Sequence, residues 1–409
     1  MIAKYYGQTL YTFEKRTGMT ALFSGEELSL IRAFVCSGEQ TAFINRLFDL
    51  GIFRGDVQPL LADCFRHAET DSPQSLHIDI TNRCPLHCAA CYKTSGEIVE
   101  MPYHQWQQLI REAEQLKVFQ IAVGGGEPMT HPEIIQFVKE VAKTEMSVTI
   151  TTSGFGLNAK LLDELIKNGL NHLQISLNGS TEAINTLSRD GYPYAIHALE
   201  LLSHTHLSYG VNWVARKSNL SDFESLAVLA RQYKAENINI LRYKPSPNED
   251  YTKECLDKEQ FMTLAQKIKQ VKGIKLKTDS AYSNLLIHIN NGKVNANTCG
   301  CGAGKTFMAI SPDSYFKPCS HLSLSDKRKT IADYWKNSPD VVTLRNIRFK
   351  NELPSTPTEK SMFSQNKVPD TCGSCIFANL CGGCRAICER IYGNITHGEQ
   401  HCPTYKSKR

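Results

Sequence analysis

An alternation of strand-like and helix-like segments runs through the middle of the chain and constrains its fold more than any other feature. Helical segments separate successive strand-like runs, which are rich in apolar and β-branched residues. Strands joined through helices pair in parallel, and such a sheet needs helices on its outer side. The sequence therefore predicts an α/β fold, a partial (β/α)6 TIM-like barrel with function at the carboxyl ends of its strands. The runs are 76–81, 119–123, 147–152, 172–177, 209–215 and 238–243.

The segments on either side of this barrel, which we expect to span residues 76–285, have other patterns. In residues 1–75, two short strand-like runs precede two stretches with apolar residues at helical spacing, which predicts a small helix-turn-helix-like module. Residues 286–409 contain few long apolar runs but many Cys and Gly residues. A segment so poor in core residues needs other stabilisation, and metal clusters would supply it.

Composition and charge narrow the class of protein. A hydrophobic content of 41% and a charged content of 21% are ordinary for a globular protein. The net charge of +5 lacks the concentrated basic footprint of a nucleic-acid binder, so we expect no nucleic-acid partner. No run reaches the roughly 18 apolar residues of a membrane span, and the N-terminus lacks the apolar core of a secretory signal. We therefore expect a cytoplasmic protein without a membrane partner.

The cysteines are grouped, which is informative in a compartment that keeps thiols reduced. Of the 15 cysteines, three lie between Cys84 and Cys91 and nine between Cys299 and Cys402. Grouped thiols in a large cytosolic protein point to metal binding. Cys84, Cys88 and Cys91 form a C-x3-C-x2-C loop directly after the first barrel strand. Three thiolates can hold an iron–sulfur cluster and leave one iron open for catalysis, although a zinc knuckle or unrelated thiols would also explain the loop.

A glycine-rich turn ends the second strand of the predicted barrel. Gly124, Gly125 and Gly126 precede Glu127 there. Glycine lets the backbone approach a ligand closely, and a carboxylate can bind an ammonium group. An ordinary turn is the alternative for this motif taken alone.

The C-terminal cysteines are numerous enough for two four-ligand metal sites. Read without other context, the two C-x2-C pairs would also fit a zinc ribbon. The presence of eight ligands and of an upstream three-cysteine loop favours iron–sulfur clusters. The eight candidate ligands are Cys299, Cys301, Cys319, Cys372, Cys375, Cys381, Cys384 and Cys402.

The three-cysteine loop, the aromatic Tyr92 after it and the Gly-Gly-Glu turn together resemble the signature of radical S-adenosylmethionine (SAM) enzymes. The resemblance implies a [4Fe–4S] cluster on the three cysteines whose free iron binds SAM, which is then cleaved to a 5′-deoxyadenosyl radical. It also implies an external electron donor such as a flavodoxin or ferredoxin. Asn178 departs from the family pattern, where Asp is common. The SAM-binding residues that the resemblance implies are Tyr92, Gly125, Gly126 and Glu127, with Thr152, Ser153 and Ser176 near the ribose and Arg189 near the carboxylate.

Residues 301–319 and 372–386 resemble the two halves of the SPASM extension of such enzymes, which holds two auxiliary [4Fe–4S] clusters. The resemblance implies interleaved ligands, with Cys299, Cys301, Cys319 and Cys384 on one cluster and Cys372, Cys375, Cys381 and Cys402 on the other. Ser314 replaces a usual Gly, and the short spacing of Cys299 and Cys301 leaves open whether both bind. Cys388 is spare, and could replace a ligand or be a buried thiol.

Enzymes of this kind mostly modify peptides, and residues 1–75 resemble the modules that capture the leader of a ribosomally made precursor peptide by β-augmentation. We therefore expect a peptide maturase with a precursor peptide as its partner. Two alternatives stay open at this point. One is a related enzyme that acts on a porphyrin or matures a protein cofactor, and the other is an iron–sulfur electron-transfer or sensing protein that never cleaves SAM.

Overall fold

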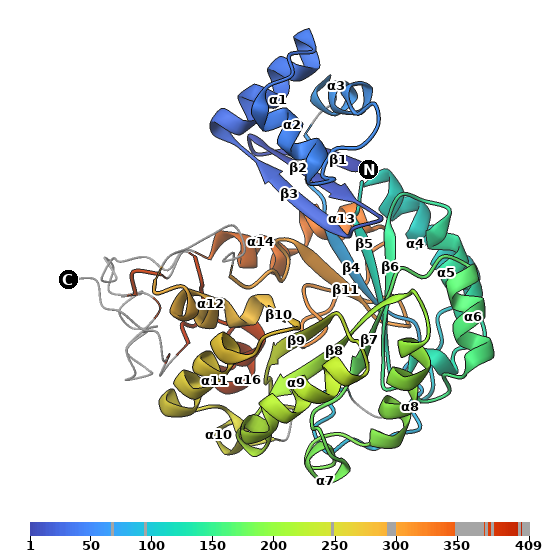
Figure 1. The fold of residues 1–409 in the computed structure, drawn as a ribbon, viewed down its shortest axis with the longest axis vertical. Coiled ribbons are helices and arrows are strands. Elements are labelled where there is room, and N and C mark those ends of the chain that lie inside the picture. Colours follow the sequence, from blue (N-terminus) through green and yellow to red (C-terminus); the bar gives the residue numbers. More distant parts are fainter. Residues whose placement is uncertain are drawn as a thin grey trace.

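A computed structural model describes residues 1–66, 69–93, 96–246, 249–292, 300–347, 372, 375–377, 380–399 and 402 of the chain. Its largest element is a nine-stranded sheet in the order β10-β9-β8-β7-β6-β5-β4-β11-β12. The six predicted strands form consecutive parallel neighbours at its centre, which confirms the predicted barrel-like α/β fold (Figure 1). They are β4 (Ser75–Asp79), β5 (Gln120–Gly124), β6 (Ser147–Thr152), β7 (His172–Ser176), β8 (Ser208–Ala215) and β9 (Asn237–Arg242).

The sheet continues beyond the six predicted strands on both edges. Strand β10 (Lys275–Thr278) extends it next to β9, and β11 (Phe307–Ile310) pairs in parallel with β4. Strand β12 (Phe316–Lys317) then pairs antiparallel with β11. The sequence analysis missed this C-terminal contribution because β11 has only four residues and lies in a Cys- and Gly-rich segment. The consequence is that residues near Cys319 are carried by the same sheet as residues near Cys84.

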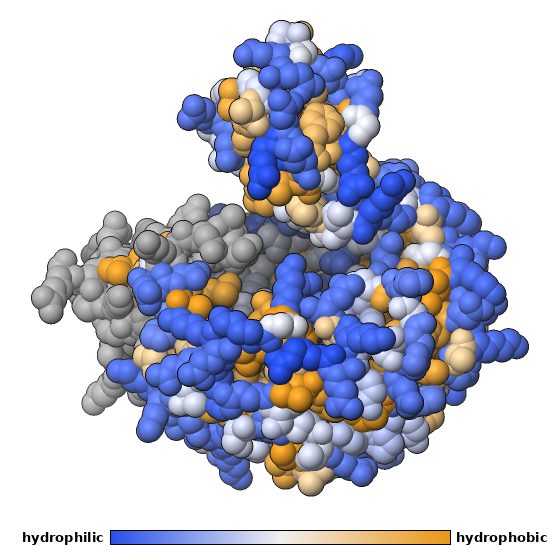
Figure 2. Space-filling view, viewed as in Figure 1, coloured by the Kyte–Doolittle hydropathy of each residue, from blue (hydrophilic) through white to orange (hydrophobic). Residues whose placement is uncertain are grey.

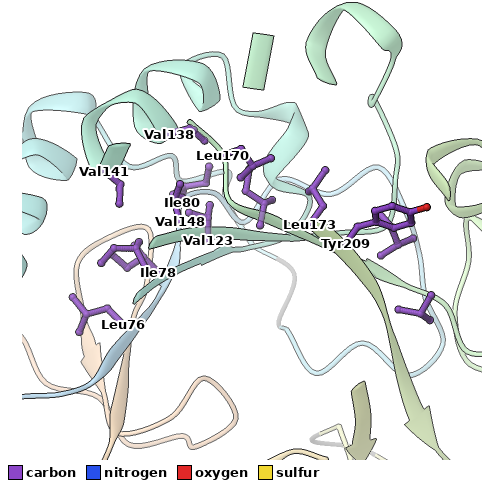
Figure 3. Packing of buried hydrophobic residues seen from close by; sticks show 14 of the residues in the cluster. Leu76, Ile78, Ile80, Val123, Val138, Val141, Val148, Leu170, Leu173 and Tyr209 are labelled. Carbon is purple, nitrogen blue, oxygen red and sulfur yellow. The ribbon is translucent and has the colours of Figure 1, made fainter. Parts of the chain in front are cut away.

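Helices cover the outer face of this sheet, as Figure 1 shows for α4, α5 and α6. Successive side chains of each strand point to opposite faces of the sheet. Apolar side chains such as Ile78, Val123 and Val148 point toward the covering helices and are fully or almost fully buried (Figure 3). Burial of this continuous apolar layer drives the sheet and helices together. The helices are α4 (Tyr103–Gln115), α5 (Ile134–Ala142), α6 (Ala159–Lys167), α7 (Glu182–Asn185), α8 (Tyr192–Ser203), α9 (Phe223–Gln232), α10 (Tyr251–Glu254), α11 (Lys258–Gln270), α12 (Ser283–Ile289), α13 (Ile331–Asn337), α14 (Pro339–Asn346) and α16 (Arg385–Tyr392).

The opposite, concave face of the sheet is polar. The register aligns Ser176, Asn212, Asn239 and Lys277 across neighbouring strands. The side chains of Asn212 and Asn239 are joined by a hydrogen bond of 3.1 Å. Polar residues at every second position therefore line the inside of the curved sheet, where a polar substrate or cofactor can be held without exposing the apolar core.

The N-terminal module contains three antiparallel strands and three helices. Strands β2 (Thr9–Glu14) and β3 (Met19–Phe23) and helices α1 (Gly25–Ser37) and α2 (Ala42–Asp49) match the predicted elements, whereas β1 (Ile2–Tyr6) and α3 (Gln58–Arg66) were not expected. The module forms a lobe that projects from the body of the molecule, and hydrophilic residues cover most of the face seen in Figure 2. No helix in the described ranges is long and apolar enough to cross a membrane.

A buried lysine attaches this module to the barrel. Lys4 on β1 is 3% exposed, and its Nζ donates to the carbonyl oxygens of Ser72 and Pro73 and to Ser72 Oγ, each at 3.0 Å. The same ammonium lies 4.8 Å from the centre of the Phe119 ring, at the start of β5. Phe119 also stacks on Phe13 of β2, with ring centres 5.5 Å apart. The hydrogen bonds of Lys4 therefore fix the segment that leads into β4, and the contacts of Lys4 and Phe13 with Phe119 join the module to the barrel.

We predict that Lys4→Met loosens this junction. The substitution keeps an apolar stem but leaves two buried carbonyl groups without their donor, which costs about 1 to 3 kcal/mol. Hydrogen exchange should become faster in β1 and in residues 72–75, while Lys258→Met, at an exposed position of α11, should leave it unchanged. Unchanged exchange in the Lys4 variant would show that the lysine does not hold the module.

Candidate functional site

The three-cysteine loop lies where the sequence predicted, at the carboxyl end of β4, and a second segment braces it. The thiols of Cys84 and Cys91 are exposed, and Cys88 is half-buried. The backbone N–H of His87 donates to Asp190 Oδ2 at 2.8 Å, and the N–H of Ala90 donates to the carbonyl of Ser188 at 3.1 Å. The segment after α7 thus holds the loop in shape and leaves its thiols open to a ligand.

The Gly-Gly-Glu turn after β5 lies directly against the root of this loop. Gly126 N donates to the carbonyl of Thr81 at 2.7 Å, and Glu127 N donates to the carbonyl of Arg83 at 2.8 Å. A Cβ atom on Gly125 would lie 2.3 Å from the Thr81 oxygen, and one on Gly126 would lie 2.3 Å from the Arg83 oxygen. Only glycine fits at either position, because the two backbones touch. The turn and the cysteine loop therefore form one unit.

Glu127 is the centre of a buried hydrogen-bond network. Its side chain is 1% exposed and accepts from Met129 N at 3.1 Å and Thr152 Oγ1 at 2.6 Å. It also accepts from Ser153 N at 2.8 Å and Ser153 Oγ at 2.5 Å. The carboxylate ties the end of β5 to the end of β6, so the hydroxyls of Thr152 and Ser153 are already engaged within the protein. Whether these three residues also bind SAM, as the sequence predicted, stays a prediction.

Arg189 presents a buried donor that no group in the described part of the chain satisfies. Its Nε is buried and has no hydrogen-bond partner among the described residues. A buried N–H without a partner is costly, so it marks a place where a ligand can accept a hydrogen bond. The residue directly follows Ser188, whose carbonyl braces the cysteine loop. The predicted contact of Arg189 with a carboxylate is compatible with this geometry.

Two further predicted positions have distinct surroundings. Ser176 ends β7 and is paired in register with Asn212 on the concave face. Asn178 is buried and fully engaged: its Nδ2 donates to Ser188 Oγ at 2.9 Å, and its Oδ1 accepts from Val214 N at 3.0 Å. Both ends of this amide are therefore needed, since one donates and the other accepts. The amide therefore connects β8 to the segment between α7 and α8.

The sequence analysis did not foresee that the cysteine loop would touch the C-terminal region. The ring of Tyr92 lies against the ring of His321, with centres 3.9 Å apart. Burial, together with the positive charges of Lys244 and Lys93, lowers the pKa of His321 well below its usual value. Lys93 in turn forms a 2.5 Å ion pair with Asp79 at the end of β4. These contacts bring the segment that follows the cysteine loop directly against the segment that follows Cys319.

The described C-terminal cysteines fall into two neighbourhoods. Burial raises the pKa of Cys319 to about 12, and charge on Cys301 and Cys384 contributes to the rise. Burial likewise raises the pKa of Cys381 to about 11, with contributions from Cys402 and Cys375. Thiols that influence one another in this way lie near one another. Burial, together with Cys384 and Cys301, raises the pKa of the spare Cys388 as well, and the interleaved ligand sets implied by the resemblance stay a prediction.

Other expectations about this region have mixed outcomes. Cys299 lies outside the described residues, Cys388 is buried in α16, and Cys372 is buried as well. Ser314 has a φ of +62°, which is the left-handed conformation that a glycine would adopt without strain. Among the residues that the structure describes, no group of three or more His, Cys, Asp or Glu side chains has the spacing for a metal ion.

Comparison with known proteins identifies the class. Residues 78–230 match the Radical SAM superfamily, so this part of the chain is a radical SAM domain, the domain of a class of enzymes that uses SAM and a [4Fe–4S] cluster. The Mycofactocin maturase MftC of Mycobacterium ulcerans is 27% identical over 80% of this chain and 87% of its own length. The PqqA peptide cyclase of Gluconobacter oxydans is 25% identical over 81% of this chain and 90% of its own length. The AdoMet-dependent heme synthase of Methanosarcina barkeri is 22% identical over 82% of this chain and 97% of its own length.

A solved structure shares the fold of nearly the whole chain. Streptococcus suis SuiB, in the crystal structure with its precursor peptide SuiA, superposes with a TM-score of 0.70 at 16% identity. The superposition covers 98% of this chain and 100% of SuiB. Since a module of more than 60 residues cannot lie in the remaining 2%, the shared fold includes the N-terminal module.

We predict that Glu127→Gln destabilises the site. An amide nitrogen cannot accept hydrogen bonds, so at least one buried donor near β6 loses its acceptor, at a cost of about 1 to 3 kcal/mol. The free energy of unfolding, measured with a chemical denaturant, should fall by about that amount. Glu200→Gln, at an exposed position of α8, serves as the control. Equal stability of the Glu127 variant and the wild type would contradict the central role of this carboxylate.

Proposed function

We propose that this enzyme modifies a ribosomally made peptide by hydrogen-atom abstraction. Cys84, Cys88 and Cys91 would hold a [4Fe–4S] cluster, which would supply the electron for the reductive cleavage of SAM and so the radical chemistry needed for hydrogen abstraction. The observation that carries the proposal is the backbone contact between the cysteine loop and the Gly125–Glu127 turn. It brings a three-thiol site with open thiols next to a turn that is able to hold a cofactor.

The chain's own residues would bind and orient the cofactor. Gly125 and Gly126 allow the turn to approach closely, and Glu127 holds the ends of β5 and β6 in place. The Nε of Arg189, which has no hydrogen-bond partner among the residues that the structure describes, would donate to the SAM carboxylate. Tyr92, held against His321, would border the same space. Ser176 and the polar concave face provide further hydrogen-bonding groups for the ribose or the substrate.

The N-terminal module supports a peptide substrate. In its three-stranded sheet β3 is an edge strand, since β2 occupies the central position. An edge strand has unpaired backbone groups that can pair with an extended peptide. Met19 and Leu22 on β3 are 38% and 45% exposed, so apolar side chains are available beside that edge. We infer that the leader of a precursor peptide adds to the sheet along β3.

We further propose that the two neighbourhoods of C-terminal cysteines hold auxiliary [4Fe–4S] clusters, as in the SPASM extension. Cys299, which the structure does not describe, is proposed as the fourth ligand of the set with Cys301, Cys319 and Cys384. Cys372, Cys375, Cys381 and Cys402 form the other set. Such clusters would accept the one electron that a peptide radical loses when it forms a closed-shell product, with the accompanying proton released from the peptide. A flavodoxin- or ferredoxin-like protein would provide the electron that starts the reaction.

The heme synthase among the relatives keeps a porphyrin substrate as the second candidate. The two candidates differ in what the N-terminal module does. A porphyrin-modifying enzyme has no need of an exposed edge strand next to apolar side chains, whereas a peptide maturase uses it for its leader.

The first test removes the three thiols of the cysteine loop. Changing Cys84, Cys88 and Cys91 together to Ala should lower the iron content of the anaerobically purified chain from about 12 to about 8 per chain, since each cubane holds four irons. Formation of 5′-deoxyadenosine from SAM should stop in the variant. Cys36→Ala, at an exposed thiol of the N-terminal module, should change neither quantity. About four irons in the wild type, together with bound zinc, would contradict the auxiliary clusters.

The second test addresses the peptide. A displayed library of random peptides, selected for binding to the wild-type protein, should yield binders that compete with one another. These peptides should bind the Met19→Glu/Leu22→Glu variant at least tenfold more weakly, because two carboxylates would replace apolar contacts at the β3 edge. Val228→Glu, at a 53% exposed apolar position of α9, is the control. Binders that retain full affinity for the β3 variant would place the peptide elsewhere. Failure to select any peptide, with turnover of an added porphyrin, would favour the second candidate.

A further inference from the structure

One short segment of the barrel contacts both flanks of Cys301. It begins at η3 (Ser280–Tyr282), just after β10, and continues into α12. Ser283 Oγ accepts a hydrogen bond from Gly300 N at 3.0 Å, and Ser280 Oγ accepts one from Gly302 N at 3.4 Å. The two glycine amides lie on either side of Cys301, so two barrel serines fix the backbone of this cysteine.

The next residue of the same segment reaches the second neighbourhood of cysteines. Asn284 is 2% exposed, and its Nδ2 lies 3.8 Å from Cys402 Sγ in a long N–H···S contact. Amide donors to cysteine sulfur stabilise the thiolate form and thereby influence the metal group that it binds. The segment therefore contacts the residues on either side of one cysteine and the sulfur of a cysteine from the other set.

A buried ion pair strengthens this connection. Arg242, the last residue of β9, and Glu399 near the C-terminus have side chains that are only 9% and 8% exposed. Arg242 Nη1 donates to Glu399 Oε2 at 2.9 Å and to the carbonyl of Ala281 at 3.2 Å, while Nη2 pairs with Glu399 Oε1. The guanidinium thus holds Glu399 in a bidentate contact and attaches it to the segment around Ser280.

Glu399 touches both sets of cysteines. Its Oε2 accepts a hydrogen bond from Cys384 N at 3.3 Å, and its own backbone N–H donates to Cys372 Sγ at 3.2 Å. A Cβ atom on Gly383 would lie 2.6 Å from Glu399 Oε2, so the glycine leaves room for the carboxylate. By the predicted ligand sets, Cys384 belongs to one cluster and Cys372 to the other. Glu399 therefore lies between the two sites, with its carboxylate against Cys384 and its backbone N–H against Cys372.

We propose that Glu399, oriented by Arg242, is a positioning residue that sets the reduction potentials of both auxiliary sites together. The inference rests on the proposed function, since it needs those clusters. A negative charge close to a cluster disfavours the addition of an electron, and N–H···S bonds favour it. Glu399 contributes a charge to both sites, whereas the side chain of Asn284 contributes a donor to one.

The experiment uses the full chain with Cys84, Cys88 and Cys91 changed to Ala, so that only the auxiliary signals remain. Redox titration followed by electron paramagnetic resonance gives a potential for each cluster. Glu399→Gln removes one negative charge and should raise both reduction potentials. We expect a rise of about 59 mV or more at each cluster, which is a tenfold change in the equilibrium of a one-electron reduction. Asn284→Ala should lower one potential and leave the other unchanged. Glu224→Gln, in a surface ion pair with Lys267, should move neither.

A double variant keeps the test decisive if Glu399→Gln alone fails to assemble. Removing one partner of a buried pair leaves the other charge uncompensated, whereas removing both does not. Arg242→Met/Glu399→Gln should therefore retain its iron and return both potentials toward those of the parent. Potentials that Glu399→Gln leaves unchanged, or that move at one cluster only, would overturn the coupling. Absence of iron from the parent protein would instead refute the auxiliary clusters themselves, and the coupling with them.

Discussion

The contact between two backbones, Gly125–Gly126 and Thr81–Arg83, is the constraint on which the rest of the site depends. Hydrogen bonds of 2.7 and 2.8 Å join the two segments, and a side chain on either glycine would push them apart. Because parallel neighbours β4 and β5 end at the same edge of the sheet, the two segments leave that edge side by side. The position of Cys84, immediately after Arg83, follows from this contact.

A second level of organisation consists of buried charged groups that connect elements distant in sequence. Glu127 connects the ends of two strands within the barrel, Lys4 attaches the N-terminal module, and the Arg242–Glu399 pair attaches the C-terminal cysteines. Each of these groups is costly to bury alone and is stabilised only by its partners. Such contacts specify one arrangement of the three regions, whereas apolar contacts between them would tolerate several.

Much of the barrel was predictable because the apolar alternation of its strands is local and periodic. The six strands begin and end within about two residues of the predicted positions. The cysteine loop and the Gly-Gly-Glu turn lie at strand ends, as expected. Strands β11 and β12 were missed, since four- and two-residue strands carry no periodic signal of their own. Their pairing depends on the neighbouring β4, which is more than 200 residues earlier in the chain.

The sequence by itself determined the chemistry of the candidate site: which thiols, glycines and carboxylate are present, and in what spacing. It did not reveal that Glu127 holds Thr152 and Ser153, that Arg189 keeps an unpartnered Nε, or that Tyr92 meets His321. Only the tertiary structure decided these features. The physical reason is that residue types and short spacings are local properties, while hydrogen bonds and burial depend on which strands the fold makes neighbours.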